Sequence, residues 1–306
     1  MPSLKDIRGR IGSVRNIAQI TRAMEMVAAS RMKRAQDSIL AARPYADELE
    51  GALSRVAGAA GLSEEIDPLL ASRPVKRAAI IVITTDRGLA GSLNANATRS
   101  VLRWVAHRAS GSGASGSGAS GSNGENAVEV EAITVGRKGR DALRRAGVPI
   151  AAHFAQLGDR PSFGDVTPIA RLVTEDFLAE KYDEIDIAYS TFVSTLAQKP
   201  EIDTILPVVR PEMADDTEVS NDEYLFEPSP EAVLRRLLPH YVAINIYRAV
   251  LENNASEQSA RMIAMRNSTE NANELIGDLT LVYNKTRQAT ITREMIEIAS
   301  GAEALG

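Results

Sequence analysis

Apolar residues recur at alternating steps of three and four positions near the start of the chain. A strict heptad series has twelve positions there, and ten are apolar, with Thr21 and Glu25 as the exceptions. Its members are Leu4, Ile7, Ile11, Val14, Ala18, Thr21, Glu25, Ala28, Met32, Ala35, Ile39 and Ala42. A mean step of 3.5 residues is the coiled-coil period, so the pattern predicts one long helix over residues 3–43. Pro44 supplies a stop or a bend.

The last quarter of the chain repeats this pattern over a longer stretch. Eleven of fourteen series positions are apolar: Leu237, Tyr241, Ile244, Arg248, Leu251, Ala255, Gln258, Met262, Met265, Thr269, Ala272, Ile276, Leu279 and Tyr283. No proline occurs between His240 and Ser300, and the apolar stripe shifts near Val282. Gly301 is a plausible C-cap. The pattern predicts a helix from about Pro230 to Ser300, roughly 70 residues or about 105 Å long.

Two long helices with one apolar seam each are expected to pair as an antiparallel, left-handed coiled coil. The alternative is two separate helices in a bundle. A second stripe (Ile17, Ile20, Met24, Val27, with Met26) lies beside the N-terminal seam. It contacts something outside the chain or widens the internal interface. Ile291, Met295, Ile298 and Ala299 lack N-terminal partners if the longer helix overshoots, and such a weakly apolar tip suits a bearing inside a protein sleeve.

The middle of the chain has a different pattern. The run 78–84 is continuously apolar and β-branched, as in a buried parallel strand. Further strands are predicted at 128–135, 149–154 and 185–192, with an edge strand at 196–206, and helices at 94–108, 138–146 and 167–182. This alternation predicts an α/β fold, a doubly wound Rossmann-like domain over residues 75–209.

Four segments follow from these patterns. They are an N-terminal coiled-coil helix at 1–60, the α/β domain at 75–209, an acidic linker at 210–230 and a C-terminal coiled-coil helix at 231–306. A loop of Gly, Ser and Ala at 109–126 interrupts the α/β domain and is assigned no activity.

Composition and charge narrow the range of possible functions. The chain has no cysteine, which excludes disulfides and thiol chemistry, and no apolar run approaches bilayer length. The start of the sequence also lacks the apolar segment of a signal peptide. The net charge is −5, yet residues 1–44 hold nine Lys and Arg against three acids. Such a basic helix fits nucleic acid, an anionic membrane, an acidic protein or simply solvent.

Catalytic motifs are not found in the sequence. The three histidines, His107, His153 and His240, have no metal-ligand spacing, and neither GxSxG nor a P-loop occurs. The turn at 84–91 follows the first strand, but it reads GxxG rather than GxGxxG, so nucleotide binding competes there with plain helix capping. No cofactor or metal is expected. The rival hypotheses are a nucleotide-binding enzyme and a nucleic-acid-binding scaffold, the latter disfavoured by the acidic balance.

Motifs at both ends resemble the gamma subunit of rotary proton-translocating ATP synthases. The segment 20–32 (ITRAMEMVAASRM) resembles the first-helix motif of that family, and 291–304 (ITREMIEIASGAEA) fits its C-terminal signature. The segments 260–265 and 281–289 and the turn at 85–91 also fit. The resemblance covers essentially the whole chain except the loop at 109–126. Plant relatives carry a cysteine-bearing insert that this chain lacks.

The resemblance implies a non-catalytic central stalk and rotor. The coiled coil would turn inside a hexamer of three alpha and three beta subunits, and its rotation would drive the catalytic beta subunits through their conformations. The epsilon subunit and the membrane c-ring would be the other partners. Membrane association would be indirect, at the cytoplasmic face of the bacterial plasma membrane, with no nucleic acid involved.

The resemblance also implies which residues contact the hexamer. Met24 resembles a shaft residue near the beta-subunit lever, and Arg261 resembles a polar contact to a beta-subunit loop. Gln288, Thr292, Glu294 and Glu297 fall in the segment that couples to the hexamer. The structural alternative is that Met24 belongs to seam packing and that Thr292 and Glu294 are ordinary helix-surface groups.

Overall fold

The computed structural model describes residues 3–60, 67–110, 128–155, 157–208 and 227–303. The chain divides into two compact units. Unit 1 consists of Met1–Ala29 with Arg261–Gly306, and unit 2 is Ser30–Ala260. Most of the loop expected at 109–126 and of the acidic linker expected at 210–230 lies outside the described residues.

Two helices are far longer than the others. Helix α1 spans Leu4–Ala60 and α5 spans Pro230–Glu303, which are 57 and 74 residues. The predicted end of the first helix near residue 43 is wrong, because α1 continues through Pro44. An interior proline costs a helix about 3 kcal/mol. Burial of Leu49, Leu53 and Val56 in the following turns offsets that cost, since each buried aliphatic side chain contributes about 1.5–3 kcal/mol.

Unit 2 is built on a five-stranded sheet with the order β3-β2-β1-β4-β5. The strands are β1 (Arg77–Ile83), β2 (Glu129–Val135), β3 (Ile150–Phe154), β4 (Glu184–Phe192) and β5 (Gln198–Leu206). The first four are parallel, and β5 pairs with β4 in the antiparallel direction at the edge. The predicted edge strand and the α/β class are therefore confirmed.

Three shorter helices connect these strands: α2 (Leu93–Ala109), α3 (Arg137–Arg145) and α4 (Phe163–Leu178). A 3-10 turn, η1, covers Pro68–Leu70. Helix α4 begins four residues before its predicted start, because Ser162 and Asp165 form a capping box. The Ser162 N–H donates to Asp165 Oδ2 over 2.8 Å, which fixes the start of the helix.

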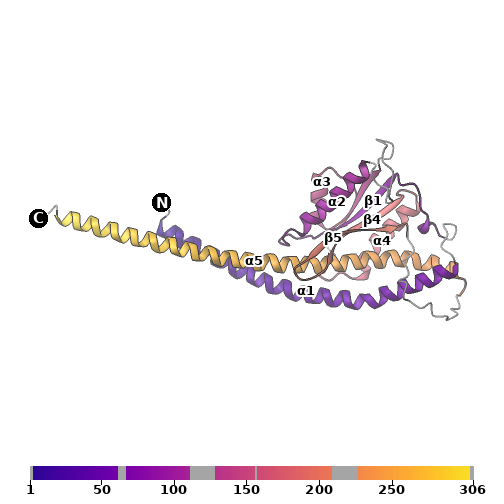
Figure 1. The fold of residues 1–306 in the computed structure, drawn as a ribbon, viewed down its shortest axis with the longest axis horizontal. Coiled ribbons are helices and arrows are strands. Elements are labelled where there is room, and N and C mark those ends of the chain that lie inside the picture. Colours follow the sequence, from indigo (N-terminus) through magenta and orange to yellow (C-terminus); the bar gives the residue numbers. More distant parts are fainter. Residues whose placement is uncertain (1–2, 61–66, 111–127, 156, 209–226, 304–306) are drawn as a thin grey trace, which may run out of the picture. The chain divides into compact units, whose positions relative to one another are not determined.

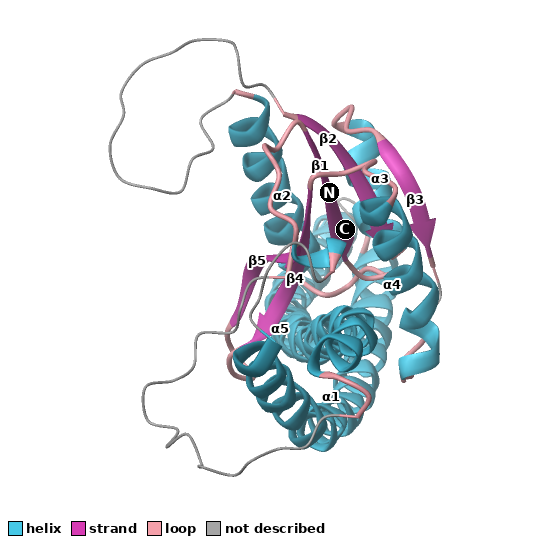
Figure 2. Cartoon of the chain, turned by 90° about the vertical axis from the view of Figure 1, so that its right-hand side faces the viewer, coloured by secondary structure: helices cyan, strands magenta, loops and turns pink. Residues whose placement is uncertain are grey.

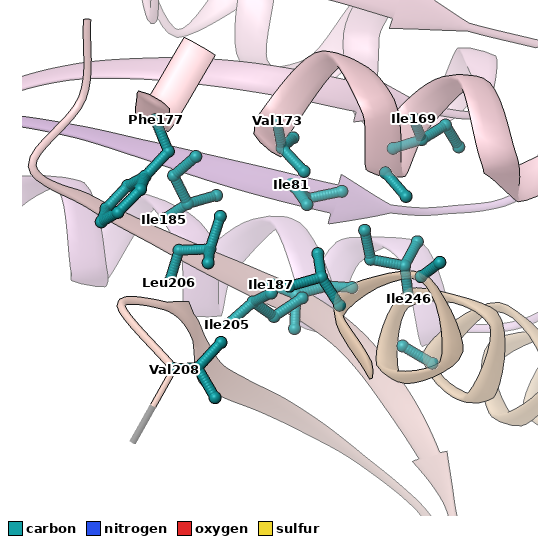
Figure 3. Close-up of a cluster of buried hydrophobic side chains, with 14 of the residues drawn as sticks. Ile81, Ile169, Val173, Phe177, Ile185, Ile187, Ile205, Leu206, Val208 and Ile246 are labelled. Carbon is teal, nitrogen blue, oxygen red and sulfur yellow. The ribbon is translucent and has the colours of Figure 1, made fainter. Parts of the chain in front are cut away.

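Helices cover both faces of the sheet (Figure 2). On one face, Ile80 and Val82 of β1 pack with Val101 of α2 and Leu143 of α3. Because side chains alternate along a strand, Ile81 points to the opposite face. There it joins a larger core, drawn in Figure 3, with α4 and with the parts of α1 and α5 that belong to unit 2. The arrangement is doubly wound, as predicted.

Unit 1 contains the first part of α1 and the last part of α5, which run antiparallel side by side. Among the helices of the described residues, none has an apolar stretch long enough to cross a bilayer. In Figure 1, the yellow end of α5 extends past the start of α1. The two helices of unit 1 carry all six residues that the sequence nominates for partner contact.

Candidate partner-binding surface

Three side-chain pairs fix the register of the coiled coil in unit 1. The hydroxyl oxygens of Thr21 and Thr269 lie 2.7 Å apart. Arg266 Nε donates to Glu25 Oε1 over 2.9 Å. Arg8 Nη2 donates to the Tyr283 hydroxyl over 2.6 Å, with the guanidinium 5.5 Å from the ring centroid. The two residue numbers in each pair add to nearly the same value, as an antiparallel pair of helices requires.

These pairs explain the two polar exceptions in the first heptad series. Thr21 meets Thr269, which is itself a polar exception in the second series, and Glu25 meets Arg266. A matched polar pair in an otherwise apolar seam penalises every other register, because a slip leaves polar groups against methyl groups. The polar seam positions thus specify alignment more than they add stability.

Most other buried residues of the seam have small or flexible side chains, with Ile7 as the exception. Ala18, Ala28, Met262, Met265 and Ala272 are all buried. Alanine lets two helices approach closely, and methionine fills irregular gaps with its flexible thioether. This seam is narrow, so much of the apolar surface of the two helices remains outside it.

The second stripe predicted on α1 is exposed. Ile17, Ile20, Met26 and Val27 are exposed, while Met24 is half-buried. Isolated exposed aliphatic residues are ordinary on proteins, but a row of them at helical spacing marks a surface that something covers. The wider internal interface, which was the alternative for this stripe, is not found for these four side chains.

The far end of α5 is exposed on every side. Residues 291–300 are all exposed, with Met295 at 65% and Ile298 at 73%. The register places Leu4 of α1 opposite residues 286–287 of α5, so the following residues lie beyond the first described turn of α1. The prediction of an apolar segment beyond the paired region is confirmed. Leu281, Val282 and Ile296, which are not members of the predicted heptad series, are exposed too.

The six nominated contact residues do not form one cluster. Gln288, Thr292, Glu294 and Glu297 are exposed and lie near the end of α5. Arg261 lies 27 residues before Gln288 on the same helix, which is about 40 Å at 1.5 Å per residue. Its side chain is engaged within the chain and the residue is only 8% exposed. The candidates therefore form a row along the rod rather than a pocket.

The turn after β1 is occupied by its own hydrogen bonds. Asn94 Nδ2 donates to Thr85 Oγ1 over 2.8 Å, and the Arg137 backbone N–H donates to Asp86 Oδ1 over 3.1 Å. A Cβ on Gly136 would lie 2.2 Å from the Thr84 carbonyl oxygen, so this approach requires glycine. Asp86 therefore caps the start of α3, whereas no side-chain hydrogen bond caps the following helix, α2, at Ser92. Among the described residues, no group of three or more His, Cys, Asp or Glu could hold a metal.

Comparison with known proteins identifies the family. A family model described as ATP synthase matches residues 3–305. The ATP synthase gamma chain of Dehalococcoides mccartyi is 47% identical over 305 residues and is covered over 100% of both chains. This chain belongs to the ATP synthase gamma chain family. The gamma chain of Roseiflexus castenholzii is 49% identical over 306 residues, covering 100% of this chain and 99% of the relative.

Solved structures share the fold of this family member. A chain of the Euglena gracilis mitochondrial ATP synthase, described as OSCP/F1/c-ring in rotational state 3, superposes with a TM-score of 0.65 at 19% identity. It covers 99% of this chain and 94% of its own. A chain from the central stalk and c-ring of the Tetrahymena thermophila mitochondrial ATP synthase gives a TM-score of 0.58 at 24% identity. The match covers 81% of this chain and 98% of that chain.

Proposed function

We propose that this gamma-family chain is the rotating central stalk of a proton-translocating ATP synthase. The row of exposed apolar side chains on unit 1 carries the proposal, because it gives a rod a surface for a surrounding sleeve. The partners would be a hexamer of three alpha and three beta subunits, the epsilon subunit and a membrane c-ring. Family membership and the shared fold support this assignment.

The surface of unit 1 suits rotation because its exposed groups bind weakly and in many orientations. Methionine, isoleucine and alanine make contacts without directional hydrogen bonds, so no single angular position is strongly favoured. Exposed ion pairs contribute about 0–1 kcal/mol each, which permits repeated making and breaking. The α1 part of unit 1, residues 1–29, holds five Lys and Arg against two acids, which favours acidic partner surfaces.

The contact residues divide by position in this proposal. Gln288, Thr292, Glu294 and Glu297 are exposed and would meet the hexamer directly. Met24 is half-buried and would contribute both to the seam and to the contact surface. Arg261 is only 8% exposed, so it would reach a partner loop with little of its guanidinium.

The chain would contribute no catalytic group of its own. ATP chemistry would belong to the beta subunits and proton passage to the membrane sector, with this chain transmitting torque between them. It would be a peripheral protein at the cytoplasmic face of the bacterial plasma membrane, held there through the c-ring. No cofactor and no nucleic acid would be needed.

Co-purification from native membranes tests the proposal. A tagged full-length chain is expected to recover alpha and beta subunits with ATPase activity. A variant truncated after Asn284 removes the unpaired end of α5 and is expected to lose coupled ATP synthesis. A chain that purifies alone, or with nucleic acid, would contradict the central-stalk assignment.

A matched deletion controls for general damage. Removal of residues 111–124 takes away 14 residues, mostly Gly, Ser and Ala, against 22 in the truncation, and the proposal assigns them no role. This variant is expected to keep both co-purification and ATP synthesis. Equal loss of synthesis in both deletions would mean that the end of α5 has no special part in coupling.

A further inference from the structure

Helices α2 and α3 of unit 2 carry an excess of positive charge. Together they hold eight Lys and Arg side chains and one acid, Asp141. Three of the eight have ion-pair partners among the residues that the structure describes. Arg108 pairs with Glu184 and Asp186, Arg137 with Asp86, and Arg140 with Asp141.

The other five basic side chains have no carboxylate of a described residue within 4.0 Å. They are Arg99, Arg103, Lys138, Arg144 and Arg145, and all five are exposed. Arg99 Nη1 donates to the Asn96 amide oxygen over 3.2 Å, and Arg103 Nε donates to the Arg99 carbonyl over 3.4 Å. These neutral acceptors leave the charges of Arg99 and Arg103 without a carboxylate partner, whereas Lys138 and Arg145 interact at longer range with Asp141.

A groove of about 600 Å³ runs between α2 and α3. On α2 it is lined by Asn94, Ala95, Thr98, Arg99, Leu102, Arg103 and Ala106. These positions repeat with helical spacing, so the groove follows one face of α2 over about 18 Å, or three helical turns. On α3 the lining residues are Lys138, Ala142 and Arg145, spaced over two turns.

The floor and the rim of this groove differ in chemistry. Ala95, Leu102, Ala106 and Ala142 make an apolar floor, and the small alanines leave room for the side chains of another helix. Arg99 and Arg103 stand one turn apart along one rim, and Lys138 and Arg145 stand two turns apart along the other. A third helix laid in the groove would place its apolar stripe on the floor and its flanks against four cations.

We propose that the groove between α2 and α3 docks an acidic amphipathic helix of a partner protein. The occupant would present apolar residues at i, i+3 or i+4 and i+7, with Asp or Glu on both flanks. The charge complementarity sets orientation and association rate, and the apolar floor supplies contact area. This surface lies outside the coiled coil of unit 1, so the inference stands apart from the central-stalk proposal.

The shape of the site favours a helix over an anionic membrane. A bilayer surface is broad and nearly flat, and it would contact projecting side chains rather than a concave floor between two helices. Single phosphate groups would bind the arginines, but they would leave the apolar floor uncovered. A helix satisfies both features together.

Site-specific photo-crosslinking in native membranes tests the proposal. The chain has no cysteine, so Ala106→Cys provides a single attachment point for a benzophenone maleimide on the floor of the groove. After irradiation and purification, mass spectrometry identifies the attached molecule. The expected adduct is a protein segment with net negative charge and apolar residues at helical spacing. A phospholipid adduct, a neutral or basic segment, or no adduct overturns the proposal.

Charge reversal and salt show whether the rim takes part. The double variant R99E/R103E is expected to lower the yield of that adduct at least five-fold. The control R171E/K199E makes the same charge change at exposed sites elsewhere in unit 2 and is expected to leave the yield unchanged. In the chain that keeps Arg99 and Arg103, raising NaCl from 0.05 to 0.5 M is expected to lower the adduct yield as well. This measurement tests the rim charges even if the double variant does not fold. An adduct yield that neither the double variant nor the added salt lowers overturns the proposal.

Discussion

The two units of this chain use apolar residues in opposite ways. In unit 2, the largest buried side chains include Phe177, Tyr182 and several isoleucines, packed on both faces of a sheet. In unit 1, the buried seam is mainly alanine, methionine and threonine, while isoleucines such as Ile298 face outward. Unit 2 therefore obtains its stability from its own core, whereas unit 1 leaves its larger aliphatic residues available to a partner.

Polar groups show the same contrast. Arg108 of unit 2 bridges the side chains of Glu184 and Asp186, and all three are largely buried. The Arg266–Glu25 pair of unit 1 is partly exposed. A buried network is costly to disturb because its charges cannot return to water, whereas an exposed pair loses little when it breaks. Four substitutions, taken from the largest expected effect to the smallest, test this difference.

Ile81→Ala is expected to have the largest effect. Ile81 is 0% exposed at the centre of the sheet, and truncation of a buried isoleucine costs about 2–5 kcal/mol. The single tryptophan, Trp104, lies in α2, so its fluorescence reports the unfolding of unit 2 in denaturant. The matched control is Ile298→Ala, at 73% exposure, which is expected to change the free energy of unfolding by less than about 0.5 kcal/mol. Similar losses in the free energy of unfolding for both variants would contradict the difference between the two units.

Ala28→Leu tests whether the seam of unit 1 is tightly packed. Ala28 is 1% exposed, and a larger side chain forced into a filled seam costs about 1–3 kcal/mol. Thermal melting followed by ellipticity at 222 nm is expected to shift downward, with little change in the denaturant midpoint of Trp104 fluorescence. Ala23→Leu makes the same change at an exposed position of α1 and is expected to be neutral. A neutral Ala28→Leu would show that the seam is loose.

The sequence predicted most of this architecture because its signals are periodic. The twelve positions of the N-terminal heptad series are all buried or half-buried, including Thr21 and Glu25. Strand β1 and helix α2 begin within one residue of their predicted starts. Periodicity reports which face is covered, and α1 has one well-defined covered face. Helix α5 is buried or half-buried on every side over residues 249–265, which its single predicted seam did not indicate.

The errors occurred where tertiary packing overrides local signals. Pro44 predicts a helix end, but Leu53 and Val56 are held in the core of unit 2 and α1 continues. The early start of α4 was readable from the Ser162–Asp165 spacing. The groove between α2 and α3 was not, because its lining residues come from two segments whose contact only the folded sheet creates. The contact roles of Met24 and Arg261 stay predictions.

The third substitution, Asp186→Asn, tests the buried network through pH. Burial, and after it the nearby Glu184 carboxylate, raise the pKa of Asp186 from 3.8 to about 6. The native state therefore binds more protons than the unfolded state between about pH 4 and 6. The contribution of Asp186 to the free energy of unfolding is largest below pH 4. It falls by about 1–3 kcal/mol as pH rises through 6. Urea unfolding followed by Trp104 fluorescence from pH 4 to 7 measures this decline.

Asp186→Asn is expected to flatten that part of the pH profile, because the amide cannot titrate. Asp6 of unit 1 provides a contrast of opposite sign. Hydrogen bonds from the side chain and backbone of Ser3 lower the pKa of Asp6, so its small contribution is present above about pH 4 and fades as pH falls. A pH profile unchanged by Asp186→Asn would show that the carboxyl of Asp186 does not control it.

Arg266→Gln is expected to have the smallest effect on stability. The pair with Glu25 is partly exposed at 2.9 Å, so its loss costs about 0.2–1 kcal/mol at low salt and less at 0.5 M NaCl. A double-mutant cycle with Glu25→Gln isolates the pairwise energy from the separate effects of each change. The exchanged pair Glu25→Arg with Arg266→Glu is expected to recover most of the loss, since the two side chains face each other across the seam. Failure of the exchange to recover stability would mean that Glu25 and Arg266 act through other neighbours, and the register would then depend on Thr21 with Thr269 and Arg8 with Tyr283.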